Sequence, residues 1–120
     1  MKHSVELQEV IDKAHKSCLN TKKYNKHLER GTLDTFYSQI LSNTVKDLIA
    51  LPVERAAQGL DPEQNPLEVS FTFACVADIV CLTFGKTFKQ VEADLVQVIR
   101  DFPTDDFRTA RKLRLSNLLH

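Results

Sequence analysis

Apolar residues recur every three or four positions along most of the chain, a spacing that places them on one face of an α-helix. The pattern is clearest between positions 33 and 51, where the apolar stripe continues without interruption. The spacing predicts helices over residues 5–19, 22–30, 33–51, 66–84 and 88–102, and a last helix that begins at Thr104.

Capping and helix-breaking residues set the ends of these predicted helices. Gly31 has the position of a carboxyl-terminal cap, and Thr32 has that of the amino-terminal cap of the next helix. Pro52 disfavours helix at the residue before it, so we expect the helix to end there and a short turn to follow at 53–58. Two prolines, an aspartate and an asparagine then predict a loop over 60–66.

Residues 66–84 are the most ambiguous segment of the chain. Apolar and polar residues alternate over 67–75, which is a strand pattern. Asn65, Pro66 and Glu68, however, have the positions of an N-cap, a first helical proline and a capping-box acid. We favour one long helix, because no other segment has a strand pattern that would pair with it. The second half of this segment is apolar all round, which predicts a central, buried helix.

Together these elements predict an all-α fold with a single helical domain over residues 1–120. We expect an irregular five- or six-helix bundle or an orthogonal helical array, with the helices over 33–51 and 66–84 at its centre. Few glycines and prolines argue against an all-β chain with many turns.

Composition restricts the compartment. The first residues carry charges where a signal peptide would need an apolar run. Three cysteines form no paired framework, so we expect reduced thiols and a cytoplasmic or other reducing intracellular location. The apolar run over 69–85 approaches the length of a membrane span, but Asp78 at its middle would cost about 2.5–3.5 kcal/mol in a bilayer. We therefore expect no membrane span.

The formal net charge is zero, but the charges are unevenly distributed along the chain. Residues 1–31 hold seven basic and four acidic residues, residues 32–107 hold five and twelve, and residues 108–120 hold four and none. The favoured interpretation is that the basic ends pair with the acidic middle within a monomer or across a dimer. The alternative is a nucleic-acid-binding module that uses the basic carboxyl-terminal helix. Its candidate contacts are Arg108, Arg111, Lys112 and Arg114.

Asp78 lies between Cys75 and Cys81 at helical spacing, which raises the question of a metal or redox site. A structural zinc site would need further cysteine or histidine ligands at close spacing, and the chain offers none. We therefore interpret the two thiols as buried and inert, and Asp78 as a buried carboxylate. Such a carboxylate needs a partner from another helix, and the hydroxyl of Tyr37 is one candidate.

No motif in the chain points to catalysis or to a cofactor, so we expect a small non-catalytic protein-interaction or regulatory module, with a homodimer as one form of it. The last predicted helix spreads leucines over more than one face, which indicates a surface that a partner covers. Its candidate apolar contacts are Leu115, Leu118 and Leu119. A second alternative is a small all-α metal-dependent hydrolase, which would need several acids to converge in a cleft. The acids available to it are Asp34, Asp47, Asp61, Glu63 and Glu92.

Overall fold

The computed structural model describes residues 5–61, 63 and 65–102 of the chain. These residues form five α-helices and no strand, which confirms the all-α prediction and decides the ambiguous segment in favour of helix. The helices are α1 (Val5–Cys18), α2 (Thr21–Arg30), α3 (Leu33–Ala57), α4 (Pro66–Phe84) and α5 (Phe88–Asp101).

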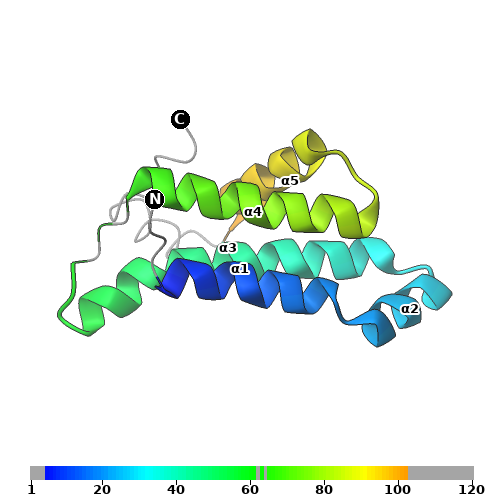
Figure 1. Cartoon of the computed structure of the whole chain (residues 1–120), viewed down its shortest axis with the longest axis horizontal. Coiled ribbons are helices and arrows are strands. Elements are labelled where there is room, and N and C mark those ends of the chain that lie inside the picture. Colours follow the sequence, from blue (N-terminus) through cyan, green and yellow to red (C-terminus); the bar gives the residue numbers. More distant parts are fainter. Residues whose placement is uncertain (1–4, 62, 64, 103–120) are drawn as a thin grey trace.

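The four long helices surround one core, and α2 lies beyond one end of them (Figure 1). Helix α1 packs against α3 and α4, and α5 packs against the same two helices from the other side. The short α2 connects α1 to α3 and packs on α3. Each long helix therefore has two main neighbours and turns its remaining surface toward solvent.

Every long helix contributes large apolar side chains to the core. Leu7 of α1, Phe36 and Leu41 of α3, Val76 of α4 and Leu95 of α5 are all at most 1% exposed. They form one continuous cluster rather than separate contacts between pairs of helices. A single core of this kind is what a one-domain chain of this length is expected to bury.

The helix ends follow the capping residues in the sequence. The side-chain oxygen of Asn65 accepts a hydrogen bond from the Leu67 amide at 2.9 Å, and that of Thr87 accepts one from the Gln90 amide at 3.1 Å. Gly31 adopts the left-handed conformation, with φ of 68°, at the end of α2, a geometry that side chains with a Cβ rarely accept. The cap predictions for Gly31 and Asn65 are thus confirmed.

Thr32 occupies the predicted N-cap position of α3, but its side chain makes no capping hydrogen bond. Its hydroxyl lies 2.7 Å from Nδ1 of His27 and 3.4 Å from the His27 carbonyl oxygen. The prediction gave the right boundary and the wrong role for the hydroxyl. The reason is that the Thr32 hydroxyl contacts the side chain of His27, in the preceding helix, instead of a backbone amide of α3.

Pro52 does not end α3, contrary to the sequence prediction, and the segment 53–58 is almost entirely the continuation of that helix. Both Pro52 and Leu51 are buried, so packing holds the chain in helical form where local preference opposes it. The last turns are also fixed by Arg55, whose guanidinium bonds Glu6 of α1 at 2.9 Å and the Asp61 carbonyl at 2.7 Å.

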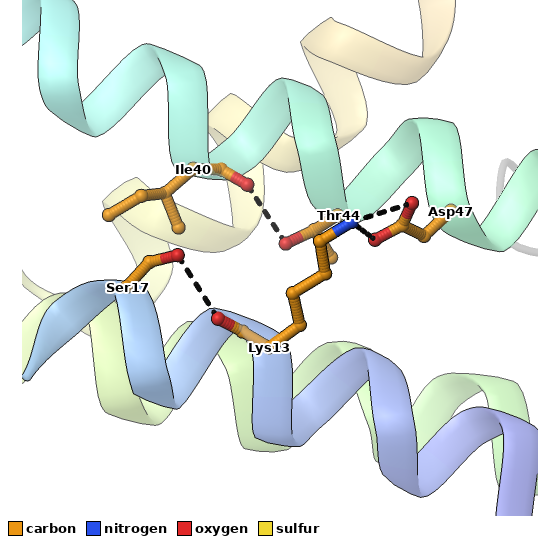
Figure 2. Close-up of polar contacts among 5 residues, drawn as sticks. All are labelled: Lys13, Ser17, Ile40, Thr44 and Asp47. Atoms are coloured by element: carbon orange, nitrogen blue, oxygen red, sulfur yellow. Dashed lines mark hydrogen bonds and ion pairs between the residues drawn. The ribbon is translucent and has the colours of Figure 1, made fainter.

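Figure 2 shows the polar contacts where α1 and α3 meet. Lys13 of α1 pairs with Asp47 of α3 at 3.2 Å, so one predicted type of contact, between the basic start of the chain and its acidic middle, is present. The buried Thr44 donates to the Ile40 carbonyl oxygen at 2.9 Å, and Ser17 donates to the Lys13 carbonyl oxygen at 3.1 Å. Both hydroxyls are therefore satisfied within their own helices.

Candidate functional site

A groove of about 550 Å³ lies between α4 and α5 on the surface of the bundle. Small side chains from both helices line it, because Ser70, Ala74 and Ala77 of α4 face the same hollow as Ala93 of α5. Larger apolar side chains such as Phe73 form its walls. Two adjacent helices with small residues at their common edge leave room for a further helix to approach closely.

The outer face of α4 beside this groove is apolar and exposed to solvent. Leu67 is 66% exposed, Phe71 is 53% exposed and Leu82 is 83% exposed. These positions recur on one face of a helix, opposite the face that carries the buried Val69 and Val76. The prediction that the second half of this segment is a buried helix is therefore wrong for its outer face, where Asp78 and Leu82 are exposed, whereas the apolar stripe of α3 is buried in the core.

Asp78 is exposed, which corrects the prediction of a buried carboxylate. It lies on the same outer face as Leu67 and Leu82, one to three helical turns from each. The prediction was wrong because the residues next to Asp78 in the sequence are apolar, but the face of α4 on which it lies is exposed to solvent. Asp78 needs no partner from another helix, since water solvates it.

The two cysteines near Asp78 are half-buried free thiols, where the sequence predicted buried ones. Burial raises the pKa of the Cys75 thiol, and the negative charge of Asp78 raises it further. The Cys81 thiol donates to the Asp78 carbonyl oxygen at 3.2 Å. A raised pKa keeps a thiol protonated and therefore weakly nucleophilic.

Helices α4 and α5 together carry five acidic and two basic residues, a net charge of −3. The rim of the groove contains Glu92, with Lys89 and Arg100 toward its two ends. The charged residues that line the groove itself are two cations and one anion, so the net charge of −3 belongs to the two helices as a whole and not to the rim of the groove.

A second polar cluster joins α3 to α5 and was not found from the sequence. The Tyr37 hydroxyl donates to Oδ2 of Asp94 at 2.5 Å, and the ammonium group of Lys86 lies 4.6 Å from the centre of the Tyr37 ring. Burial raises the pKa of Tyr37 above its ordinary range, and the hydrogen bond to Asp94 and the charge of that carboxylate raise it further. A phenol that holds its proton so firmly joins two helices and is not a base. Tyr37 was expected to meet a carboxylate, but the partner is Asp94 and not Asp78.

The residues of α2 form an exposed basic surface at the end of the bundle. His27 stacks on Phe36 of α3 with ring centres 5.0 Å apart, and the ammonium group of Lys23 lies 5.4 Å from the centre of the same ring. These contacts attach α2 to the core and direct its other cations to solvent. The exposed cations of this helix are Lys22, Lys23, Lys26 and Arg30.

The contacts predicted in the carboxyl-terminal segment lie outside the described residues. They are Arg108, Arg111, Lys112, Arg114, Leu115, Leu118 and Leu119. The last predicted helix, from Thr104 onward, lies there as well.

No group of three or more histidine, cysteine, aspartate or glutamate side chains is placed to hold a metal ion within residues 5–61, 63 and 65–102. The acids proposed for the hydrolase alternative all belong to that part of the chain, so they do not gather into a metal site. The geometry gives this alternative no support.

One helix in the described part of the chain, α4, is long and apolar enough to cross a membrane by length and composition alone. The core helix of a bundle satisfies the same criterion, and α4 packs along α1 and α5. Comparison of the chain with protein-family models, with curated proteins and with solved structures finds no match.

Proposed function

We propose that this chain is a non-catalytic protein-interaction module that binds its partner on the α4–α5 surface. We define this surface as the groove between the two helices together with the exposed Leu67, Phe71 and Leu82. The observation that carries the proposal is the exposure of two α4 leucines, at 66% and 83%, beside the groove. Each buried Å² of apolar surface contributes about 25 cal/mol, so a partner that covers these residues gains affinity from them.

The partner that fits this surface is an amphipathic helix with leucines on one face and lysines or arginines beside them. A groove between two helices accommodates a third helix laid along it. The net charge of −3 on α4 and α5 as a whole favours the approach of a basic partner over that of an acidic one. A second copy of the same surface fits less well, because symmetric pairing would place like charges against one another.

The test uses the full chain and a designed helical peptide of leucine and lysine, with a leucine–glutamate peptide of the same pattern as the control. Fluorescence anisotropy of labelled peptide should show binding of the basic peptide only. Ala93→Arg fills the groove and adds a repelling charge, so it should weaken binding at least about tenfold. Ala56→Arg is the matched control, because Ala56 is an exposed alanine on α3 away from the groove.

Two results would contradict the proposal. One is equal binding of the basic and acidic peptides, which would remove the role of the net negative charge of α4 and α5. The other is equal weakening by Ala93→Arg and Ala56→Arg, which would place the contact elsewhere. Light scattering of the unmodified chain separately decides whether it forms the homodimer that the apolar surface also permits.

A second candidate, nucleic-acid binding, is supported by the exposed cations of α2. Four basic residues and one acidic residue on a ten-residue helix give a compact positive surface. Binding through phosphates should fall steeply as salt increases. If α2 makes the contact, Lys22→Glu with Lys26→Glu should abolish nucleic-acid binding. If the carboxyl-terminal segment makes it, Arg111→Glu with Arg114→Glu should abolish that binding instead.

The three cysteines of the chain support a companion proposal about location. Cys18, Cys75 and Cys81 are all free thiols in the structure. Burial raises the pKa of Cys18, which makes that thiol inert. Free thiols that are retained in this state are typical of a reducing intracellular compartment.

A further inference from the structure

We propose that the basic end of the bundle, where α2 meets the turn between α4 and α5, binds the phosphate backbone of a nucleic-acid duplex without reading its sequence. This surface deepens the second candidate function, nucleic-acid binding, and rests on it, because it adds a cation from outside α2 and names the class of nucleic acid. We define the basic end as the exposed cations of α2 together with one lysine of the turn. These residues are Lys22, Lys23, Lys26, Arg30 and Lys86.

A cluster of aromatic rings brings Lys86 to the same end of the bundle as α2. The ring of Phe84, at the end of α4, has its centre 5.9 Å from that of Tyr24 in α2 and 5.4 Å from that of Tyr37 in α3. The ammonium group of Lys86 lies over the Tyr37 ring, 4.6 Å from its centre. Figure 1 shows the turn between α4 and α5 at the end of the bundle beyond which α2 lies. The fold therefore gathers cations that are distant in the sequence.

Two of these cations are held over rings that belong to one rigid cluster. The ammonium group of Lys23 lies 5.4 Å from the centre of the Phe36 ring, and Lys86 occupies the same kind of position over the adjacent Tyr37. Both rings contact Phe84 edge-on, with centres 5.6 Å and 5.4 Å from it. Side chains that are ordered before a ligand arrives lose less conformational entropy when they bind it.

The other cations of α2 form a row that points to solvent. Lys22, Lys26 and Arg30 follow each other at intervals of four residues, so they share one face of the helix and are separated by a rise of about 6 Å at each step. All three are exposed. A row of separated cations can contact successive phosphates of one strand, which is how most of the affinity for nucleic acid arises.

Positive charge exceeds negative charge at this end of the described chain. Glu29 is the acid of α2, and Asp34 lies in the first turn of α3. Asp94 lies near Lys86, because it accepts the hydrogen bond from the Tyr37 hydroxyl. Five cations against these three acids leave a net charge of +2. A ligand with closely spaced negative charges is therefore favoured.

The position of the apolar residue of α2 favours nucleic acid over a membrane surface. Leu28 is 55% exposed, but at 3.6 residues per turn it lies at least about 120° around the helix from every cation of α2. A helix that binds a bilayer surface has an apolar face to insert, with cations beside it. Here a flat bilayer could not meet Leu28 and the row of cations together.

The burial of the aromatic rings favours a duplex over a single strand. Phe36 is 1% exposed and Tyr37 is 5% exposed, and Tyr24 is half-buried against Phe84. Proteins that bind single strands use aromatic rings on which unpaired bases stack. These rings are covered, so the basic end has cations for phosphates but no such platform. A duplex keeps its bases stacked on one another and presents its phosphates outward.

The dependence of duplex binding on salt tests the surface directly. Fluorescence anisotropy of a short labelled DNA duplex with the full chain gives the slope of log affinity against log salt concentration. Each phosphate contact contributes about 0.9 to this slope, so Lys86→Gln should lower it by about 0.9. Lys86→Arg keeps the charge and should keep the slope. Lys46→Gln is the matched control, because Lys46 is an exposed lysine in the middle of α3, and it should leave the slope unchanged.

Three results would overturn the inference and leave α2 as a nucleic-acid contact. The first is an unchanged slope in Lys86→Gln while Lys22→Glu with Lys26→Glu still abolishes binding. The second is a slope that Lys86→Arg fails to keep, which would assign the effect to lost packing on Tyr37. The third is tighter binding of the matching single strand than of the duplex.

Other outcomes distinguish the basic end from the proposed protein-binding surface. No binding of the duplex, or tighter binding of phosphatidylserine vesicles, would overturn this inference and the nucleic-acid candidate together. Neither result would affect the α4–α5 surface, because Lys86 and the cations of α2 do not line that groove. Conversely, Ala93→Arg should weaken binding of the leucine–lysine peptide and leave duplex binding unchanged. A marked loss of duplex binding in Ala93→Arg would place the duplex on the groove and overturn the inference.

Discussion

Helices α3 and α4 are both long and rich in apolar residues, but they use those residues differently. Helix α3 directs its apolar side chains into the core and presents polar residues to solvent. Helix α4 buries one apolar face and exposes another, which includes Leu67 and Leu82. The solvent-facing polar residues of α3 are Asp34, Thr35, Ser38, Gln39, Ser42, Asn43 and Lys46.

Burial in the core accounts for the apolar residues of α3, but it does not account for the exposed apolar residues of α4. The apolar pattern of α3 is accounted for by the core alone. The exposed leucines of α4 contribute little to that core, and a surface that covered them would gain the free energy of removing apolar area from water. Under the proposed function, a partner surface covers them beside the groove with α5.

The largest expected contrast between α3 and α4 is in stability, after truncation of one leucine on each helix. Leu41 of α3 is 1% exposed, so Leu41→Ala should lower the free energy of unfolding by about 2–5 kcal/mol through lost burial and a cavity. Leu82 of α4 is 83% exposed, so Leu82→Ala should change it by less than about 0.5 kcal/mol. Urea unfolding of both variants gives the difference.

Similar losses of unfolding free energy in Leu41→Ala and Leu82→Ala would mean that Leu82 is buried in the folded chain as Leu41 is. In that case the proposed binding surface would already be part of the fold. Val53→Ala serves as the control, because Val53 is the exposed large apolar residue of α3, at 45%. It should behave like Leu82→Ala and not like Leu41→Ala.

The next largest effect concerns the bond that joins α3 to α5. Tyr37→Phe removes the hydroxyl that donates to Asp94 and keeps the buried ring, so the variant should lose about 1.5 kcal/mol of stability. Asp94 keeps its second contact, from the Gln90 side chain at 3.0 Å. Urea unfolding at neutral pH measures the loss.

The same bond makes stability depend on pH in the alkaline range. Because the pKa of Tyr37 is raised in the folded chain, its unfolded form gives up a proton first, above about pH 10. The unfolded state then binds fewer protons than the native state, so stability falls as pH rises. Unfolding midpoints between about pH 9 and about pH 11 should fall less in Tyr37→Phe than in the unmodified chain. Parallel curves would show that Tyr37 does not keep its proton.

Helix positions could be predicted from the sequence because the spacing of apolar residues and the caps act locally. Asn65 with Pro66 predicted the start of α4 correctly against a competing strand pattern. The continuation of α3 through Pro52 could not be predicted, because burial of that proline depends on residues far away in the chain. Local preference opposes a helix there, and tertiary packing overrides it.

The candidate site was harder to predict, because exposure is a property of the assembled bundle. The sequence shows that residues 74–84 are apolar, but it does not show which side of them faces α1 and which faces solvent. Asp78 was misplaced for that reason. The contact between Tyr37 and Asp94 joins positions 57 residues apart, and neither residue carries a local signal of the other.

The starts of α3 and α4 give a smaller, sharper contrast. Asn65→Ala removes the capping bond to the Leu67 amide and should destabilise the chain by about 1 kcal/mol. Thr32 makes no capping bond, so Thr32→Ala should cost less, about 0.5 kcal/mol from the lost contact with His27. Urea unfolding would contradict this ranking if Thr32→Ala proved the more damaging change.

The smallest expected effect on stability is at Asp78, on the exposed outer face of α4. A buried carboxylate would make its replacement matter for stability, but this one is exposed, so Asp78→Asn should change the free energy of unfolding by less than about 0.5 kcal/mol. Its charge should instead matter for binding, because it lies on the outer face of α4 beside the leucines. Loss of this charge should weaken binding of the leucine–lysine peptide by a few-fold at low salt and less at high salt. An unchanged affinity together with a large loss of stability would restore the structural role that the sequence suggested and remove Asp78 from the binding surface.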